Sequence, residues 1–274
     1  MTIEYADSHG HLTMLFEGDE MKGAPRASSA AEVKELVNRA KDAGVTRILV
    51  PGTRRGDLRL AVDLAEEHDG VFAAVGIHPH EAKEFDEDED LKLFEELSAS
   101  KKVVAVGEIG LDYHYDHSPK EAQRYALEAQ LRFAREKGLP VLLHNRESER
   151  DLLPILERLH PGDSGNLRGV FHSFCAGQET GRRVLALGYL VSFSGMITFK
   201  TADNVRNAAA ALPLASMLLE TDAPYLAPTP FRGKPNESSF LPRTAARLAE
   251  VKDVPVEEVA RVTTDNFRRL FRVS

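Results

Sequence analysis

The sequence predicts one α/β domain of the (β/α)8, or TIM, barrel class over residues 1–274, with extra helices at its C-terminal end. Apolar segments of strand length alternate eight times with segments of helical periodicity. Each strand segment is a continuous apolar run, which is typical of parallel strands buried on both faces. No linker, low-complexity tract or short repeat divides the chain, and its length suits one large α/β domain.

The expected strands cover residues 3–11, 45–50, 71–77, 103–106, 140–143, 169–171, 189–193 and 217–222. The expected helices cover residues 31–43, 57–68, 91–97, 119–137, 149–159, a segment ending at Gly188, 203–212, 241–251, 256–262 and 263–271. The helix at 31–43 keeps apolar residues on one stripe and stops at Gly44, whereas 119–137 begins with proline and stops at Gly138. An open doubly wound sheet is the alternative, but no glycine-rich phosphate loop follows the first strand.

The net charge of −8, from 35 basic and 43 acidic residues, argues against a protein that binds nucleic acid through bulk positive charge. The acidic excess is concentrated in residues 81–90 (EAKEFDEDED). We expect this segment to be a solvated loop whose acids favour the start of the following helix.

Cellular location is predicted from what the sequence lacks. No apolar run approaches the ~20 residues of a membrane span, and a signal peptide has no room before a strand that begins at residue 3. The single cysteine, Cys175, permits no internal disulfide and is expected to be a small, partly buried apolar residue rather than a nucleophile. We expect a cytoplasmic protein without membrane attachment, and a monomer, with an oligomer as the alternative.

Polar side chains occur at or just past the ends of six of the eight expected strands. In chain order they are His9 and His11, His78, Glu108, His144, His172, and Asp222. Each alone has an ordinary explanation as a hydrogen-bonded structural residue. In a barrel, however, the carboxyl ends of the strands converge on one rim, where active sites are built. The pattern therefore predicts a shared metal site, to which the first strand contributes Asp7, His9 and His11 from one face.

The chemistry of these side chains narrows the choice of metal. Imidazole and carboxylate ligands without thiolate favour Zn, Mn, Fe, Co or Ni, with Mg possible where carboxylates dominate. Five imidazoles and two carboxylates exceed the needs of one ion, so we expect two ions bridged by a carboxylate, with Glu108 as the candidate bridge. Two neighbouring ions polarise a phosphoryl oxygen, lower the pKa of a shared water and stabilise the leaving oxygen.

The order of motifs also resembles a known family. The motifs are D-S-H-G-H-L, G-I-H-P-H-E-A, G-E-I-G-L-D-Y, L-P-V-L-L-H-N-R-E, G-V-F-H-S-F, S-F-S-G-M-I-T-F-K, L-L-E-T-D-A-P-Y-L and R-G-K-P-N-E. Over residues 7 to about 240 the sequence resembles the TatD family of metal-dependent deoxyribonucleases, a TIM-barrel branch of the amidohydrolase superfamily. The resemblance implies hydrolysis of DNA, often as a 3′-to-5′ exonuclease, with single strands or 3′ ends as substrate.

The resemblance also assigns roles to residues. It implies one metal held by His9, His11, Glu108 and Asp222, and a second held by Glu108, His144 and His172, the ions being Mg, Mn or Zn. It places His78 and Glu220 beside the reaction centre as catalytic residues. Three features depart from the family pattern: Ser173-Phe174-Cys175-Ala176 replaces a Cys-Phe-Ser-Gly sequence, Ser238 replaces a proline, and the acidic run follows His80.

The expected mechanism is phosphodiester hydrolysis by a metal-activated water, which Asp222 orients or deprotonates. Arg146, Lys200 and Arg232 are the candidate phosphate contacts, and ordinary surface charge is the alternative for each. Tyr113 or Phe231 would stack on bases of a single strand, unless they are packing residues.

Other functions remain open at the level of sequence. The same metals suit an ester or amide hydrolase, such as a D-aminoacyl-tRNA deacylase. A non-enzymatic nucleic-acid-binding or scaffold protein is a third hypothesis, and the full set of candidate metal ligands argues against it. A Ser-His-Asp hydrolase is disfavoured because the Gly-x-Ser-x-Gly elbow is missing from the sequence.

Overall fold

The computed structural model describes residues 3–16, 25–159 and 168–274, which contain an eight-stranded parallel sheet in the order β1-β4-β5-β6-β7-β8-β9-β10. Its strands are β1 (Tyr5–Asp7), β4 (Val45–Val50), β5 (Val71–Val75), β6 (Val103–Asp112), β7 (Val141–Arg146), β8 (Gly169–Phe171), β9 (Tyr189–Phe193) and β10 (Met217–Leu219). A short antiparallel pair, β2 (Met14–Leu15) and β3 (Arg26–Ala27), stands apart from this sheet. The predicted (β/α)8 barrel is confirmed.

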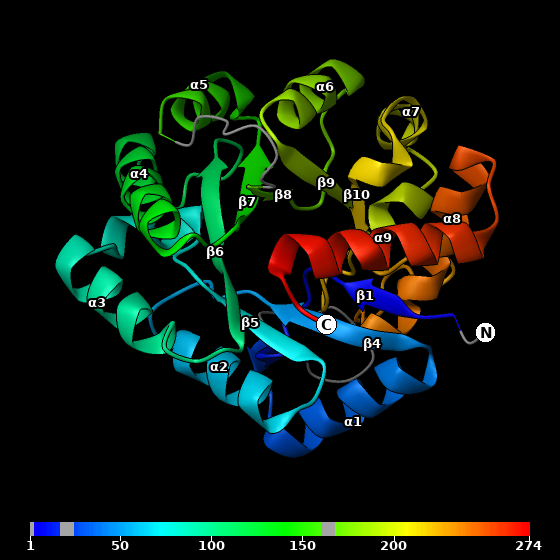
Figure 1. Ribbon diagram of the computed structural model, residues 1–274, viewed down its shortest axis with the longest axis horizontal. Coiled ribbons are helices and arrows are strands. Elements are labelled where there is room, and N and C mark those ends of the chain that lie inside the picture. Colours follow the sequence, from blue (N-terminus) through cyan, green and yellow to red (C-terminus); the bar gives the residue numbers. More distant parts are fainter. Residues whose placement is uncertain (1–2, 17–24, 160–167) are drawn as a thin grey trace.

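Helices surround the sheet (Figure 1). The α-helices are α1 (Ala30–Asp42), α2 (Leu58–Glu67), α3 (Glu87–Leu97), α4 (Lys120–Lys137), α5 (Glu149–Leu159), α6 (Gln178–Ala186), α7 (Asp203–Ala211), α8 (Leu241–Lys252) and α9 (Val256–Phe271). Short 3-10 helices are η1 (Pro79–Glu84), η2 (Gly195–Thr198), η3 (Leu214–Ser216) and η4 (Ser238–Phe240). No helix in the described ranges has both the length and the apolar character needed to cross a membrane.

The barrel is closed by hydrogen bonds that join the segment after β1 to the end of β10 and the residues that follow it. The Ser8 N–H donates to the Leu219 carbonyl (2.9 Å), the Asp222 N–H to the His9 carbonyl (2.8 Å), and the His11 N–H to the Ala223 carbonyl (2.8 Å). The same closing contacts therefore fix the backbone of three predicted site residues, because two of the donors and one acceptor belong to them.

The inside of the barrel is a small apolar core. It contains at least one buried side chain from every strand: Ala6, Leu49, Ala74, Val104, Ala105, Leu142, Val170, Leu190 and Leu218. Phe267, Leu270 and Phe271 of α9 pack against this layer, and α9 lies across one end of the barrel in Figure 1. Because α9 closes the amino-terminal end of the strands, the carboxyl end is left for the polar residues.

Several predicted boundaries are wrong. Strand β7 runs three residues past its predicted end, β10 stops three residues before its own, and α3 begins four residues earlier than predicted. The expected helices at 256–262 and 263–271 are one helix, α9, because Thr263 returns its hydroxyl to the Val259 carbonyl (2.8 Å) instead of ending the helix. The first strand ends at Asp7, so His9 and His11 lie in the loop beyond it. Strand β6 runs to Asp112, six residues past its predicted end, and is paired with β7 up to Arg146.

The acidic segment 81–90 is largely helical rather than a loop, although four of its seven acidic residues are exposed, as predicted. Its first part belongs to η1 and its last part to α3, whose first turn contains four acidic residues. Asp86 caps α3 by accepting the Glu89 N–H (3.0 Å), and Asp90 is buried against Arg55, with Oδ1 2.7 Å from the Arg55 Nε. The acids stabilise the helix start, as expected, and all of them except Asp90 are at least partly exposed to solvent.

The extended β6–β7 pair requires glycine at position 110. Gly110 has φ +149°, and a Cβ built there would lie 2.0 Å from the backbone oxygen of His144. We expect Gly110→Ala to lower the free energy of unfolding by about 3 kcal/mol, because the methyl group must push the two strands apart. Gly56→Ala, whose methyl group meets open space, is the control, and urea denaturation measures both. Equal stabilities for the two variants would contradict this account.

Candidate metal centre

Four predicted ligands converge, three of them from the segments that follow β1 and β10 and one, Glu108, from within β6. The Nε2 atoms of His9 and His11 lie 3.2 Å apart, and the His9 Nε2 is 3.2 Å from the Glu108 Oε2. The Asp222 Oδ1 is 3.5 Å from the His11 Nε2 and 3.8 Å from the His9 Nε2. Each donor atom thus faces the others across a space of a few ångströms.

A second group forms around the other oxygen of Glu108. The Glu108 Oε1 is 2.8 Å from the His144 Nδ1 and 2.8 Å from the His172 Nε2, and these two nitrogens are 3.2 Å apart. The structure therefore brings together all six residues predicted as ligands. The Glu108 carboxylate lies between them, with one oxygen directed to each group.

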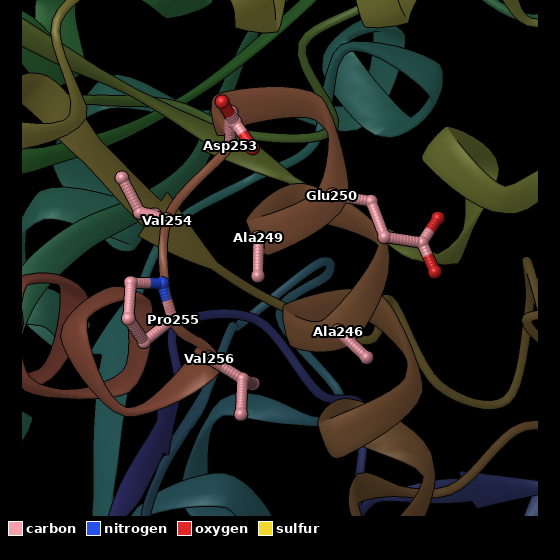
Figure 2. Close-up of a pocket in the computed structure, with 7 residues that line it drawn as sticks. All are labelled: Ala246, Ala249, Glu250, Asp253, Val254, Pro255 and Val256. Atoms are coloured by element: carbon pink, nitrogen blue, oxygen red, sulfur yellow. The ribbon is translucent and has the colours of Figure 1, made fainter.

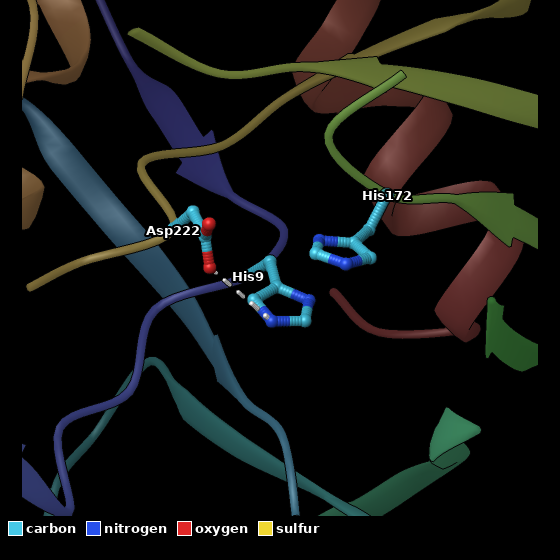
Figure 3. A group of neighbouring side chains, drawn as sticks. All are labelled: His9, His172 and Asp222. Atoms are coloured by element: carbon cyan, nitrogen blue, oxygen red, sulfur yellow. Dashed lines mark ion pairs between the residues drawn. The ribbon is translucent and has the colours of Figure 1, made fainter. Parts of the chain in front are cut away.

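The two groups are contiguous. The rings of His9 and His172 are stacked with centroids 4.1 Å apart and an interplanar angle of 14°. Figure 3 shows these two imidazoles side by side, with Asp222 approaching His9 from the segment after β10. Donor atoms of His9, His172 and Asp222 lie close enough together to share an ion, as do those of His9, His11 and Glu108 and those of His78, Glu108 and His144. The geometry therefore permits other groupings of ligands than the one expected from the sequence.

His78 faces the second group but differs from a ligand in its hydrogen bonding. Its Nε2 is 3.3 Å from the Glu108 Oε1 and 3.4 Å from the His144 Nδ1. Its Nδ1 accepts the His80 backbone N–H (3.1 Å), and burial lowers its pKa to about 4. The neutral ring consequently carries its proton on Nε2, where it can donate to a group in the site.

The sequence interpretation missed Asp112 as a site residue. Its Oδ2 accepts hydrogen bonds from the His144 Nε2 (3.0 Å) and the His80 Nε2 (2.9 Å). Its Oδ1 accepts the backbone N–H groups of His114 (2.9 Å) and Tyr115 (3.0 Å). Asp112 therefore fixes the His144 proton on Nε2 and leaves Nδ1 free to bind an ion, a common arrangement behind metal-binding histidines.

We expect Asp112→Asn to weaken metal binding about 10- to 100-fold. The asparagine amide must direct its NH₂ group either at the imidazoles of His80 and His144 or at the two backbone N–H groups. The first orientation moves the His144 proton to Nδ1, the nitrogen that faces Glu108. Calorimetric titration with Zn or Mn measures the affinity, and Asp116→Asn, exposed in the same loop, is the matched control. Unchanged affinity in Asp112→Asn would remove the residue from the site.

Two buried carboxylates support the cluster from behind. The prediction that Asp7 shares a face with His9 and His11 is wrong. Asp7 instead accepts hydrogen bonds from the Thr221 N–H (2.9 Å), the Thr221 hydroxyl (2.6 Å) and the Ser238 hydroxyl (2.7 Å). Burial raises the pKa of Asp7 to about 6. Glu220 places Oε1 3.4 Å from the His172 Nδ1 and accepts the Ser173 N–H (2.6 Å). Both act by holding the backbone and rings that carry the donor atoms.

The electrostatics of the cluster favour a bound cation. Burial acts to raise the pKa of Glu108 and of Asp222, but the surrounding imidazoles outweigh it and lower both pKa values, so both groups are ionised. Burial acts to lower the pKa of His11, His144 and His172, yet the neighbouring carboxylates raise these pKa values. Carboxylate charge buried in this way needs compensation, which imidazolium or a metal ion supplies.

The three basic residues predicted to contact substrate are exposed. Arg146 ends β7 with its guanidinium 4.9 Å from the Tyr115 ring centroid, and Arg232 lies 3.5 Å from that of Phe199, next to Lys200. Within the described ranges Arg146, Lys200 and Arg232 form no ion pair, so their charges are available to an anion.

The two aromatic residues proposed for base stacking have other contacts. The Tyr113 hydroxyl donates to Asp151 (2.8 Å), and the Lys120 ammonium lies 4.3 Å from its ring centroid. Phe231 is stacked on Phe240 with centroids 4.0 Å apart. Both are engaged in packing.

A surface pocket lies away from this cluster, in the region where α8 meets α9 (Figure 2). It is lined by Ala246, Ala249, Glu250, Asp253, Val254, Pro255 and Val256. This lining is mostly apolar and has no histidine, so the pocket lacks the groups that a metal-dependent reaction would need.

Comparison with known proteins identifies the family to which the chain belongs. A family model described as TatD related DNase matches residues 6–272. The chain belongs to the TatD family. It is 40% identical over 243 residues to the uncharacterized metal-dependent hydrolase YabD of Bacillus subtilis, covering 89% of this chain and 94% of the relative. Identity is 38% over 267 residues with the uncharacterized metal-dependent hydrolase YcfH of Escherichia coli, covering 97% and 95%.

Solved structures agree with this membership. The crystal structure of YjjV, a TatD homologue from Escherichia coli, superposes with a TM-score of 0.88 at 34% identity, and the match covers all of both chains. The TatD-family barrel and its closed amino-terminal end therefore provide the frame in which the cluster is held.

Proposed function

We propose that this TatD-family protein is a metal-dependent hydrolase that cleaves phosphodiester bonds of DNA, acting as a 3′-to-5′ exonuclease on single strands or 3′ ends. Its proposed cofactor is a pair of divalent ions, Mg, Mn or Zn. We assign His9, His11, Glu108 and Asp222 to one ion, and Glu108, His144 and His172 to the other.

The observation that carries this proposal is the Glu108 carboxylate, which directs Oε2 to His9 and Oε1 to His144 and His172. The spacing of the donor atoms in the first group supports an ion there. Two ligand atoms ~2.1 Å from a tetrahedral ion are about 3.4 Å apart. The separations within the first group, 3.2 to 3.8 Å, are close to this value.

Two divalent ions held by these residues would supply Lewis-acid catalysis: they would polarise a phosphoryl oxygen, acidify a water and stabilise the leaving oxygen. The protein supplies position and charge. Asp222 is ionised and its side chain is 15% exposed, against 4% for Glu108, so it is the carboxylate placed to orient the attacking water or take its proton. His78 presents an N–H on the opposite side of Glu108, where it can donate to a substrate oxygen.

Phosphodiester binding is supported by the charges at the rim. Arg146, Lys200 and Arg232 offer guanidinium and ammonium groups to phosphates. The acidic segment beside His80 is partly neutralised, because Asp90 is paired with Arg55, and Glu87 lies 3.3 Å from Arg132. A polyanion therefore meets less repulsion there than the sequence alone implies.

The test is cleavage of end-labelled single-stranded DNA by the purified protein with Mg, Mn or Zn, with bis(p-nitrophenyl) phosphate as a simple phosphodiester. Stepwise shortening from the 3′ end supports the proposal. Deacylation of D-aminoacyl-tRNA with DNA left intact would instead assign the same cluster to ester hydrolysis, and binding without cleavage under every metal would make the protein a binding module.

A further inference from the structure

An exposed aromatic group stands beside the cluster on the β6–β7 side. Tyr115 follows β6 and is 44% exposed. Its ring is 5.7 Å from that of His117 at 27°, and the Arg146 guanidinium lies 4.9 Å from its centroid. We call Tyr115, His117 and Arg146 the aromatic wall, since each presents a planar group suited to stacking.

The aromatic wall is connected to the metal-binding residues by direct contacts. The Tyr115 ring meets the His80 ring edge-on, with centroids 5.6 Å apart. His80 shares the Asp112 carboxylate with His144, and the Tyr115 N–H donates to the same carboxylate. A substrate group that contacts Tyr115 is therefore separated from His144 by about the width of one side chain, that of His80.

Exposed large apolar side chains are rare in the described residues, where Tyr115 and Tyr125 are the two that occur. Tyr125 lies on α4, and its hydroxyl donates to Glu87 (2.7 Å). An exposed ring costs hydrophobic stabilisation. Tyr115 differs from Tyr125 in lying next to the unpaired Arg146 guanidinium and next to His80, which shares the Asp112 carboxylate with His144.

We propose that the aromatic wall binds an unpaired nucleobase next to the cleaved linkage, with the Tyr115 ring packing on the base and the Arg146 guanidinium binding the adjacent phosphate. This inference rests on the proposed function and deepens it by naming the residue that accounts for the proposed preference for single strands and frayed ends, because a base paired within a duplex presents no open face to Tyr115.

The experiment measures binding of metal-loaded protein to a fluorescent single strand with cleavage-resistant phosphorothioate linkages, and to an abasic strand of the same length. We expect Tyr115→Ala to weaken binding of the base-containing strand about 10-fold while the abasic strand binds as to the wild type. Tyr115→Phe, which keeps the ring, should restore the affinity. Tyr125→Ala is the matched control and should bind both strands normally.

The preference for a single strand over a blunt duplex should also fall about 10-fold in Tyr115→Ala. Equal binding by Tyr115→Ala and wild type, or equal losses on both strands, would overturn the inference. If the wild type cleaves bis(p-nitrophenyl) phosphate and Tyr115→Ala still selects single strands normally, only the aromatic wall is rejected. If the wild type cleaves no phosphodiester and binds neither strand, the proposed function is rejected with it.

Discussion

Replacing Glu108 by glutamine is expected to lower kcat/KM at least about 1,000-fold and to reduce the bound metal below the two ions per chain that we propose. The amide keeps the volume of the side chain but removes its charge and one of its two acceptor oxygens. Both oxygens are in use, with Oε2 3.2 Å from the His9 Nε2 and Oε1 2.8 Å from the His144 and His172 nitrogens. Losing an ion removes several kcal/mol of transition-state stabilisation, which corresponds to a rate change of this size.

Elemental analysis after dialysis measures the metal content, and hydrolysis of bis(p-nitrophenyl) phosphate measures the activity. Circular dichroism establishes that the barrel is still folded. Asp90→Asn is the matched control, because it alters a buried carboxylate, paired with Arg55, outside the cluster. A Glu108→Gln protein that holds two ions and turns over normally would show that Glu108 does not bridge them.

The fold was predictable because it is specified by a pattern that repeats along the whole chain rather than by single residues. Continuous apolar runs, each followed by a helical segment, specify parallel strands buried on both faces. Since parallel strands in a barrel share one carboxyl end, the residues after them had to meet. The convergence of His9, His11, Glu108, His144, His172 and Asp222 follows from this topology without any knowledge of side-chain contacts.

The roles of Asp112, Asp7 and Tyr115 were not predicted, because they depend on where the strands end and on hydrogen bonds. Asp112 was missed because β6 was expected to end six residues earlier, although Glu108, Gly110 and Asp112 alternate along one face of an extended strand and give a signal that could have identified it. The role of Asp7 was misjudged because the chain leaves β1 at that residue. Tyr115 was not singled out, because its exposure is set by the β6–β7 extension and has no counterpart in local sequence.

Replacing Asp222 by asparagine is expected to separate catalysis from metal binding. Asp222 has φ +57°, a left-handed conformation that asparagine tolerates and alanine does not, so the amide tests the charge without disturbing the backbone. At saturating metal we expect both proposed ions to remain bound but hydrolysis to fall about 100- to 10,000-fold, because the water would lose the group that we propose to orient it and accept its proton.

Single-turnover hydrolysis across a metal titration is the appropriate measurement for Asp222→Asn. If Asp222 only bound metal, excess ion would restore the full rate, since its Oδ1 is 3.5 and 3.8 Å from two imidazole nitrogens that would still hold the ion. A rate that stays low at saturation assigns the carboxylate to the chemical step. Paired with Glu108→Gln, which loses metal and activity together, this result would divide the two carboxylates by function: one joins the ions, and the other acts on the water.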